Sequence, residues 1–387
     1  MRTMAVNYDA IVVGAGSVGI PTALALAQAG QRTLVIDHMP SVGQGCNKHA
    51  IGGVRATHSD PAKIALCLRS IAILSTWQER YGDDVEWHQG GYVFVAYREQ
   101  EKRSLLDLLT DQQAHGLGID WLDTQSLLEV APALNPQNLL GGTYSPGDGY
   151  ASPLLALHAQ YRHAQHLGAD FRFRERVCEV MVQAGRVCGV RTGSATYHAP
   201  VVVNAAGAGA RALSEEVGET LPIRCDAHEA GITEPVARLI EPLIVDIRAT
   251  AGTANCYFCQ HRTGQFIFCM TPHPNAWGTD SRETSSFLPL VARRLIALVP
   301  QLGHVRVRRT WRGLYPMTPD GRPIVGWSQE VEGLLHAGGM CGQGFMLGPG
   351  VGELVARTVT GTMDDQDRQI LANLSPYRSF SQQERLK

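Results

Sequence analysis

Three glycines near the beginning of the chain have the spacing of a turn that binds a dinucleotide. Gly14, Gly16 and Gly19 follow the apolar run 10–13 and precede a segment with the composition of a helix. In such a turn the first glycine permits a tight bend, the second lets a pyrophosphate approach the backbone, and the third lets the helix pack on the strand. The N–H groups at the start of the helix then bind the phosphates. Asp37 closes the next apolar run, where a carboxylate can bind ribose hydroxyls. The pattern predicts a site for FAD or NAD.

A second glycine-rich segment, 338–350, helps to distinguish between these two cofactors. It follows an apolar run at 333–337 and precedes a predicted helix over 351–360. An NAD-dependent dehydrogenase has no need of such a segment. A flavin enzyme does, because the reduced ring carries negative charge that a helix N-terminus stabilises, and because glycines let backbone N–H groups reach the ring edge. The two segments together favour FAD, although the second alone is also compatible with an ordinary glycine-rich loop.

Five stretches of the chain together resemble the FAD-dependent D-amino-acid oxidase and sarcosine oxidase superfamily. They are 12–37, 45–55, 202–207, 310–326 and 338–352, and the resemblance covers nearly the whole chain. Within the superfamily it is strongest to the β subunits of hetero-oligomeric sarcosine oxidase and of dye-linked proline and opine dehydrogenases. The resemblance implies an α/β fold. An FAD-binding Rossmann-type domain of the glutathione-reductase kind would be interleaved with an α+β substrate domain built on an antiparallel sheet.

The resemblance also implies which residues surround the FAD, and that the FAD is not covalently attached. Some relatives attach their flavin to a cysteine at the position of Gly313, or to a histidine in the stretch that matches 149–155, and neither residue is present here. The loop 45–53 would pass over the flavin, and Val177 would contact the adenine through its backbone. The implied cofactor-binding residues are Gly14, Gly16, Ser17, Val18, Gly19, Asp37, His38, Gly45, Cys46, Asn47, Lys48, Ile51, Gly52, Gly53, Val177, Ala206, Gly207, Gly313, Gly339, Met340, Gly342, Gln343, Gly344, Phe345 and Met346.

The predicted catalytic residues mainly hold the substrate, because in amine oxidation the cofactor itself accepts the hydride. Arg55 is the predicted anchor for a substrate carboxylate, since a guanidinium offers a bidentate fork; a structural ion pair is the alternative. Tyr315 is expected over the flavin ring, or else in the core. His49 could accept a proton or simply pack, and Tyr257 could line the pocket. The role of His228 is left open.

Met346 bears on the destination of the electrons. Oxidases of the superfamily carry a lysine at this position, whereas the dehydrogenase β subunits carry methionine. The resemblance therefore implies an amine or amino-acid dehydrogenase that oxidises a C–N bond in proline, hydroxyproline, an opine or sarcosine. It would pass electrons to a larger α subunit and a small ferredoxin-like subunit. A stand-alone oxidase that makes hydrogen peroxide, and an FAD-bearing assembly subunit without catalysis, are the alternatives.

The elements that must position these residues divide between two predicted domains. The FAD-binding domain is expected to comprise 1–82, 146–222 and 315–387, and the substrate domain 83–145 and 223–314. The polar segment from Ser375 is expected to be loose. Strands are predicted at 10–13, 32–36, 92–96, 176–180, 187–191 and within 256–270, and helices at 20–29, 99–116 and 286–299.

Composition excludes several other classes of protein. The chain has 387 residues, 44% of them hydrophobic, and a formal net charge of −2, so it lacks the basic surface of a nucleic-acid-binding protein. No apolar stretch reaches the roughly 18 residues that span a bilayer, and no signal-peptide pattern is visible, so a cytoplasmic protein with reduced cysteines is expected. Cys256 and Cys259 lack further ligands for a metal and are too few for a four-thiolate iron–sulfur cluster. An FMN or such a cluster would be held with a partner subunit.

Overall fold

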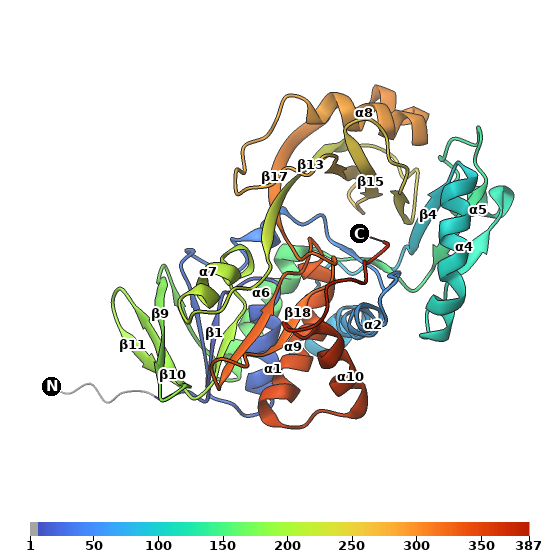
Figure 1. The fold of residues 1–387 in the computed structure, drawn as a ribbon. Coiled ribbons are helices and arrows are strands. Elements are labelled where there is room, and N and C mark those ends of the chain that lie inside the picture. Colours follow the sequence, from blue (N-terminus) through green and yellow to red (C-terminus); the bar gives the residue numbers. More distant parts are fainter. Residues whose placement is uncertain (1–6, 387) are drawn as a thin grey trace.

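The computed structural model describes residues 7–386, and Figure 1 shows one large β-sheet in the lower half of the molecule and another in the upper half. The lower sheet has the strand order β18-β19-β12-β1-β2-β8. All neighbouring strands in it are parallel except β18, which is antiparallel to β19. Its strands are β1 (Ala10–Val13), β2 (Thr33–Asp37), β8 (Asp170–Phe173), β12 (Val202–Asn204), β18 (Ile324–Trp327) and β19 (Leu334–Gly338). The short apolar runs of the sequence are thus parallel strands buried on both faces.

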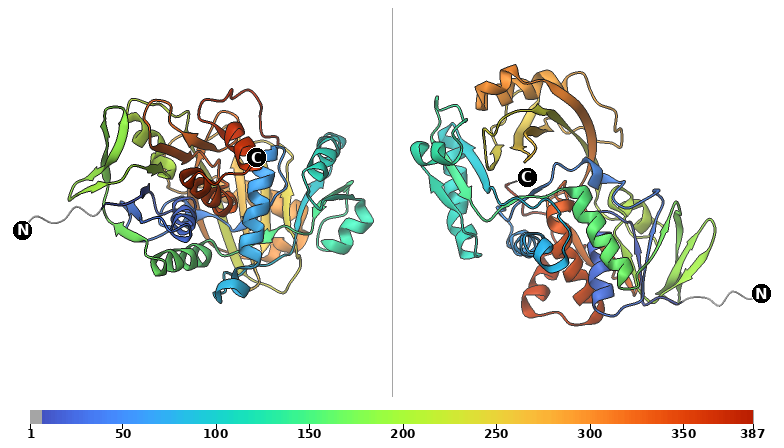
Figure 2. Two further views of the ribbon diagram at one scale, coloured as in Figure 1. Left: turned by 90° about the horizontal axis from the view of Figure 1, so that it is seen from below. Right: turned by 180° about the vertical axis from the view of Figure 1, so that it is seen from behind.

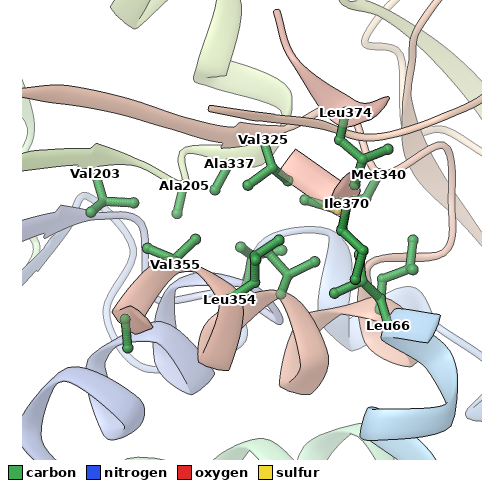
Figure 3. Packing of buried hydrophobic residues seen from close by; sticks show 14 of the residues in the cluster. Leu66, Val203, Ala205, Val325, Ala337, Met340, Leu354, Val355, Ile370 and Leu374 are labelled. Atoms are coloured by element: carbon green, nitrogen blue, oxygen red, sulfur yellow. The ribbon is translucent and has the colours of Figure 1, made fainter. Parts of the chain in front are cut away.

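The two faces of the lower sheet are covered by different layers, because successive residues of a strand point to opposite sides. Val12 and Val203 face the helices α1 (Gly19–Gln28), α2 (Pro61–Ser75) and α9 (Gly344–Thr360). Figure 3 shows Val203 and Val325 on the sheet above Leu354 and Val355 of α9. The opposite face packs on a separate sheet of β9 (Val177–Gln183), β10 (Arg186–Thr192) and β11 (Thr196–His198). The predicted hairpin of 176–191 therefore lies outside the parallel sheet.

Helix α9 begins at Gly344, and the prediction of a helix starting at 351 was wrong. The glycines that suggested a loop are needed for close helix packing. A Cβ on Gly348 would lie 1.7 Å from the Ser17 carbonyl oxygen, and one on Gly350 would lie 2.2 Å from that of Leu66. Helix α9 can therefore approach α1 and α2 only without side chains there. Tertiary contact outweighs the poor helix propensity of glycine.

The upper sheet has the strand order β17-β13-β16-β15-β14-β4-β6-β5 and is antiparallel except for the parallel pair β14 and β4. One face is covered by α8 (Phe287–Leu298) and the short helix η3 (Pro300–His304), where the Phe268 and Phe287 rings stack. The strands are β4 (Tyr92–Ala96), β5 (Asp120–Leu122), β6 (Gly141–Ser145), β13 (Arg224–Pro235), β14 (Leu243–Asp246), β15 (Thr253–Gln260), β16 (Gln265–Pro272) and β17 (Val307–Met317).

The long strands β13 and β17 extend from the upper sheet toward the lower half of the molecule (Figures 1 and 2). Helix α6 packs on α1 in the lower half, and the short helix η1 contacts both α6 and β17. The remaining elements are η1 (Cys46–His49), β3 (Gly53–Val54), α3 (Trp77–Tyr81), α4 (Glu99–Ala114), α5 (Thr124–Val130), β7 (Gly149–Tyr150), α6 (Pro153–His166), η2 (Gly207–Gly209), α7 (Ala210–Glu215) and α10 (Asp365–Leu374).

The segment after Ser375 is tied to the rest of the molecule, so the expectation of a loose segment was wrong. Arg378 donates to both carboxylate oxygens of Asp320, at 2.9 and 3.0 Å. Glu384 and Leu386 are both 3% exposed. The segment gains its order from partners that are distant in sequence, which its polar composition does not reveal.

The predicted α/β fold class is confirmed, as are the predicted strands at 10–13 and 92–96 and the helix of α4. The two sheets suggest a natural division of the chain, and the domain boundaries stay a prediction. Among residues 7–386, no helix combines the length and the apolar character required to cross a membrane.

Candidate active site

A cavity of about 1110 Å³ lies between the two halves of the molecule. Its wall includes the carboxyl ends of β1 and β2, the loop 44–53, the 205–209 turn, strands β13, β15 and β17, and the 338–346 segment. Every predicted cofactor-binding and catalytic residue lines this cavity, with the single exception of Gly19. The structure therefore brings together residues from stretches that are far apart in the sequence.

The three glycines of the first turn have different surroundings. A Cβ on Gly14, which has a φ of +111°, would lie 2.4 Å from the Ala205 carbonyl oxygen. A Cβ on Gly19 would lie 1.8 Å from the Gly14 carbonyl oxygen, so Gly19 serves helix packing rather than the cavity wall. A Cβ on Gly16 would meet nothing within 4 Å, because Gly16 faces open space in the cavity. This is the division of roles that a pyrophosphate-binding turn requires.

Asp37 holds its carboxylate at the cavity wall through backbone hydrogen bonds. One oxygen accepts from the Ala15 N–H at 2.7 Å, and the other accepts from the Met39 N–H at 2.8 Å. The first of these bonds joins the end of β2 to the glycine turn. Each carboxylate oxygen can still accept another hydrogen bond, so Asp37 can both shape the turn and bind a ribose hydroxyl.

The loop 44–53, which contains η1, is anchored by two hydrogen bonds but leaves two buried polar atoms without partners. The Asn47 side chain donates to the Pro153 carbonyl oxygen at 3.0 Å, while its buried Oδ1 has no partner. The Trp311 indole donates to the His49 carbonyl oxygen at 2.9 Å, and His49 Nδ1 is also buried without a partner. Burial, followed by the charge of Lys48, lowers the pKa of His49, so its ring is neutral near pH 7. A Cβ on Gly313 would lie 2.7 Å from His49 Cβ.

The 338–346 segment lines the cavity and places the N-terminus of α9 there. Gly339 and Gly342 have φ angles of +63° and +80°, which glycine adopts without strain. No side chain caps α9, so the N–H groups of its first turn, beginning at Gly344, are available to a ligand. The buried Oε1 of Gln343 has no partner. Two uncapped helix N-termini, those of α1 and α9, therefore face one cavity. The glycine turn, the Asp37 carboxylate placed for a ribose, and the buried polar atoms without partners together fit FAD as the ligand of this cavity.

The end of the cavity formed by the upper sheet carries a compact group of titratable side chains. The hydroxyls of Tyr257 and Tyr315 lie 2.6 Å apart. The His228 ring stacks on Tyr315, with centroids 3.8 Å apart, and its Nε2 lies 3.0 Å from Asp226 Oδ2. Asn275 donates to the same Asp226 oxygen at 2.6 Å. His228 Nδ1 is buried without a partner.

The group has a defined protonation pattern near neutral pH. Burial raises the pKa of both Tyr257 and Tyr315 well above the usual range, so both hydroxyls keep their protons. Burial alone would raise the pKa of Asp226, but the hydrogen bonds from His228 and Asn275 outweigh it and the pKa lies below its usual range. Asp226 is therefore an anion, and its Oδ2 can accept a hydrogen bond from His228 Nε2.

The predicted carboxylate anchor, Arg55, lines the cavity but is largely buried and already engaged. Its Nη1 donates to the Thr57 carbonyl oxygen, its Nη2 donates to that of Leu386 at 2.8 Å, and its guanidinium lies over the Phe94 ring at 5.2 Å. Arg55 forms no ion pair with a carboxylate within residues 7–386. The alternative of a structural ion pair is thus not what the structure shows.

Two side chains of the site were not identified from the sequence, namely Asp226 and Asn275, and His228 was noted without a role. Residues two apart on a strand share a face, so the spacing of Asp226 and His228 would have been a usable signal had the strand β13 been predicted. The stacking of the His228 ring on Tyr315 required the register of β13 with β17, in which Asp226 pairs with Tyr315. Cys256 and Cys259 belong to clusters on different faces of the upper sheet and do not share a site.

Comparison with known proteins agrees with this geometry. Residues 9–358 match the family described as DAO, FAD dependent oxidoreductase. The chain is 27% identical to the hydrogen cyanide synthase subunit HcnC of Pseudomonas aeruginosa, over 91% of this chain and 92% of that protein. It is 28% identical to the glycine oxidase of Geobacillus kaustophilus, over 91% of this chain and 93% of that protein.

Solved structures show the same fold. The L-proline dehydrogenase from P. horikoshii superposes with a TM-score of 0.90 at 27% identity, covering 97% of this chain and 98% of that chain. Glycine oxidase from Geobacillus kaustophilus superposes with a TM-score of 0.85 at 26% identity. Given its match along most of its length and a cavity built for FAD, the chain belongs to the DAO family of FAD-dependent oxidoreductases.

Proposed function

We propose that this protein oxidises the C–N bond of a secondary amine or amino acid, of the proline, hydroxyproline, opine or sarcosine type. The observation that carries the proposal is the Asp226–His228 pair in the wall of the FAD cavity. When bound, FAD supplies the acceptor for a hydride from the carbon next to the nitrogen. The protein must then present that nitrogen with a free lone pair.

The group around His228 is suited to this task. An alkylammonium substrate arrives protonated at neutral pH, and its nitrogen has no lone pair with which to form the C=N bond of the product. His228 Nδ1 takes the proton from the ammonium, while the Asp226 carboxylate stabilises the resulting imidazolium through Nε2. The Tyr257 and Tyr315 hydroxyls keep their protons: one proton forms the hydrogen bond between them, and the other is donated to a polar group of the substrate.

The names of the relatives support an amine or amino acid as substrate. They include glycine oxidases, a 4-methylaminobutanoate oxidase and a sarcosine dehydrogenase, each matched over most of this chain. The structure that superposes with a TM-score of 0.90 is an L-proline dehydrogenase. Arg55 in the cavity wall provides positive charge for a substrate carboxylate.

We further propose that the protein acts as a catalytic β subunit that passes electrons to a partner subunit. Support comes from Met346, which lines the cavity where oxidases of the superfamily carry lysine. One relative, HcnC, is by its name a subunit of a larger enzyme.

The test is turnover by the purified, FAD-loaded chain with proline, hydroxyproline, sarcosine and an opine. The proposal expects reduction of an artificial dye and little hydrogen peroxide. Peroxide formed as fast as the dye is reduced would instead identify a stand-alone oxidase. A chain that binds FAD but oxidises no amine with either acceptor would favour an assembly subunit.

A further inference from the structure

Residues Gln383–Leu386, here called the strap, lie between the two halves of the molecule. The C mark in Figures 1 and 2 shows this end of the chain beneath the upper sheet and beside α2. Backbone and side-chain bonds hold the strap in place. The Glu384 N–H donates to the Asp320 carbonyl oxygen at 2.8 Å, and the Arg385 N–H donates to Ser59 Oγ at 2.8 Å.

Glu384 forms a fully buried ion pair with Lys63 of α2. The Lys63 Nζ and Glu384 Oε2 lie 3.1 Å apart, and both side chains are 0% exposed. The other carboxylate oxygen accepts from the N–H and hydroxyl of Ser59, at 3.0 and 2.7 Å, and from the Leu386 N–H at 2.9 Å. A buried pair of this kind contributes little net stability because both charges lose their water. It does fix the position of the segment that carries it.

Leu386 connects the strap to the cavity wall through two contacts. Its side chain is 3% exposed and packs in a cluster with Tyr92 and Phe94 of β4. Its carbonyl oxygen accepts from Arg55 Nη2 at 2.8 Å. The guanidinium of Arg55 is thus held between the Leu386 carbonyl, the Thr57 carbonyl and the face of Phe94.

The result is a guanidinium in the cavity wall that makes no direct ion pair with a carboxylate among residues 7–386. Arg55 is 6% exposed and lines the cavity. Its protein partners within residues 7–386 are carbonyl oxygens, the His58 ring at 3.1 Å and an aromatic face, none of which is an anion. Lys63, by contrast, is neutralised by Glu384 of the strap. The strap therefore orients Arg55 without forming an ion pair with it, and its guanidinium stays a cation in the cavity wall.

We propose that the strap is a positioning element of the substrate site, in which Glu384 and Leu386 hold Arg55 to bind the carboxylate of an amino-acid substrate. This inference rests on the proposed function and narrows it to amines that carry an acid. Glu384 and Leu386 act through Arg55, and neither needs to touch the substrate.

The test compares ligands with and without a carboxylate. Pyrrole-2-carboxylate has the ring and acid of proline but no hydride to lose, and pyrrole lacks the acid. Binding of each to the FAD-loaded protein is measured by the change in the visible flavin spectrum. We expect Leu386→Gly and Glu384→Gln each to weaken pyrrole-2-carboxylate binding fivefold or more, with pyrrole binding and FAD content unchanged. Arg385→Ala, on the exposed side of the strap, should change both affinities by less than twofold.

Two further variants keep the test decisive. Glu384→Gln leaves the buried Lys63 charge without a partner, which can prevent folding. In that case the double variant Lys63→Met with Glu384→Leu removes both charges and frees the strap from the ion pair. Arg55→Lys should lose acid binding at least as strongly as Leu386→Gly. Where proline is turned over, the strap variants should raise its KM fivefold or more and change kcat by less than twofold, with KM for pyrrolidine unaltered.

Three outcomes would overturn the inference. They are pyrrole-2-carboxylate affinity unchanged in Leu386→Gly, equal weakening of pyrrole and pyrrole-2-carboxylate, and no binding of pyrrole-2-carboxylate to the unaltered protein. Since this readout needs no turnover, failure of the proposed oxidation would appear separately, as binding of the acid without oxidation of any amine.

Discussion

The substitution Asp226→Asn tests the role of His228 with little change in shape. It replaces an anion, whose Oδ2 lies 3.0 Å from His228 Nε2, with a neutral amide of nearly the same size. The imidazolium formed when Nδ1 takes a proton then loses its counter-charge. A hydrogen bond to a charged group contributes about 1.5–3 kcal/mol, and about 1.4 kcal/mol corresponds to a factor of ten in rate. We therefore expect flavin reduction to slow by about ten- to a hundredfold at pH 7.

The assay is anaerobic stopped-flow measurement of flavin reduction by an amino-acid substrate at saturating concentration. The deficit should shrink as the pH approaches the pKa of the substrate ammonium, about 10 for an alkylamine, because the substrate then arrives without its extra proton. Asp280→Asn, which changes an exposed carboxylate outside this group, serves as the control. A rate within twofold of the unaltered protein at pH 7, or a deficit that stays constant up to pH 10, would refute the assignment of His228 as proton acceptor.

Three further predictions follow from the geometry. Gly19→Ala places a Cβ 1.8 Å from the Gly14 carbonyl oxygen. Because that oxygen belongs to the backbone and cannot rotate away, we expect the protein to lose about 1–3 kcal/mol of stability and to retain less FAD after purification. An unchanged FAD content would contradict the packing role of Gly19. Gly342→Ala places a Cβ 2.1 Å from the Tyr315 ring at a φ of +80°, so the flavin reduction rate should fall at least tenfold while far-UV circular dichroism stays the same. Burial would raise the pKa of Glu384, but Lys63 and three hydrogen bonds lower it to about 2, below its usual value of about 4.3. A carboxylate whose pKa is lowered by folding stabilises the folded protein above its pKa in the unfolded chain, and this stabilisation is lost as the pH falls from about 4.3 to about 2. In Glu384→Gln, the free energy of unfolding measured with urea should therefore fall less steeply over that pH range than in the unaltered protein.

Much of the cofactor site was predictable because its residues are local in sequence. Gly14, Gly16 and Gly19 stand at fixed spacing between a strand and a helix, and Asp37 follows at the end of the next strand. Each of these positions depends on backbone geometry that recurs wherever this turn occurs. The structure adds the reason for each glycine, since only Gly16 faces open space while Gly14 and Gly19 meet carbonyl oxygens.

The parts that the sequence did not reveal depend on contacts between distant segments. The early start of α9 depends on Ser17 and Leu66, which meet glycines at 348 and 350. The order of the strap depends on Lys63, more than 300 positions earlier in the chain. The His228 ring stacks on Tyr315 because β13 pairs with β17, which lies about 85 positions later in the chain. Local composition argued for a loop, a loose segment and a histidine without a role, and in each case tertiary packing decided otherwise.

The measurement that tests the central claim most directly is anaerobic titration of the FAD-loaded protein with proline, hydroxyproline, sarcosine and an opine, followed by the visible flavin band. The account predicts that at least one of these amines bleaches the band, and that deuterium on the carbon next to the nitrogen slows the bleaching. A protein that holds FAD in the cavity but keeps its full absorbance with every amine would contradict the proposed oxidation.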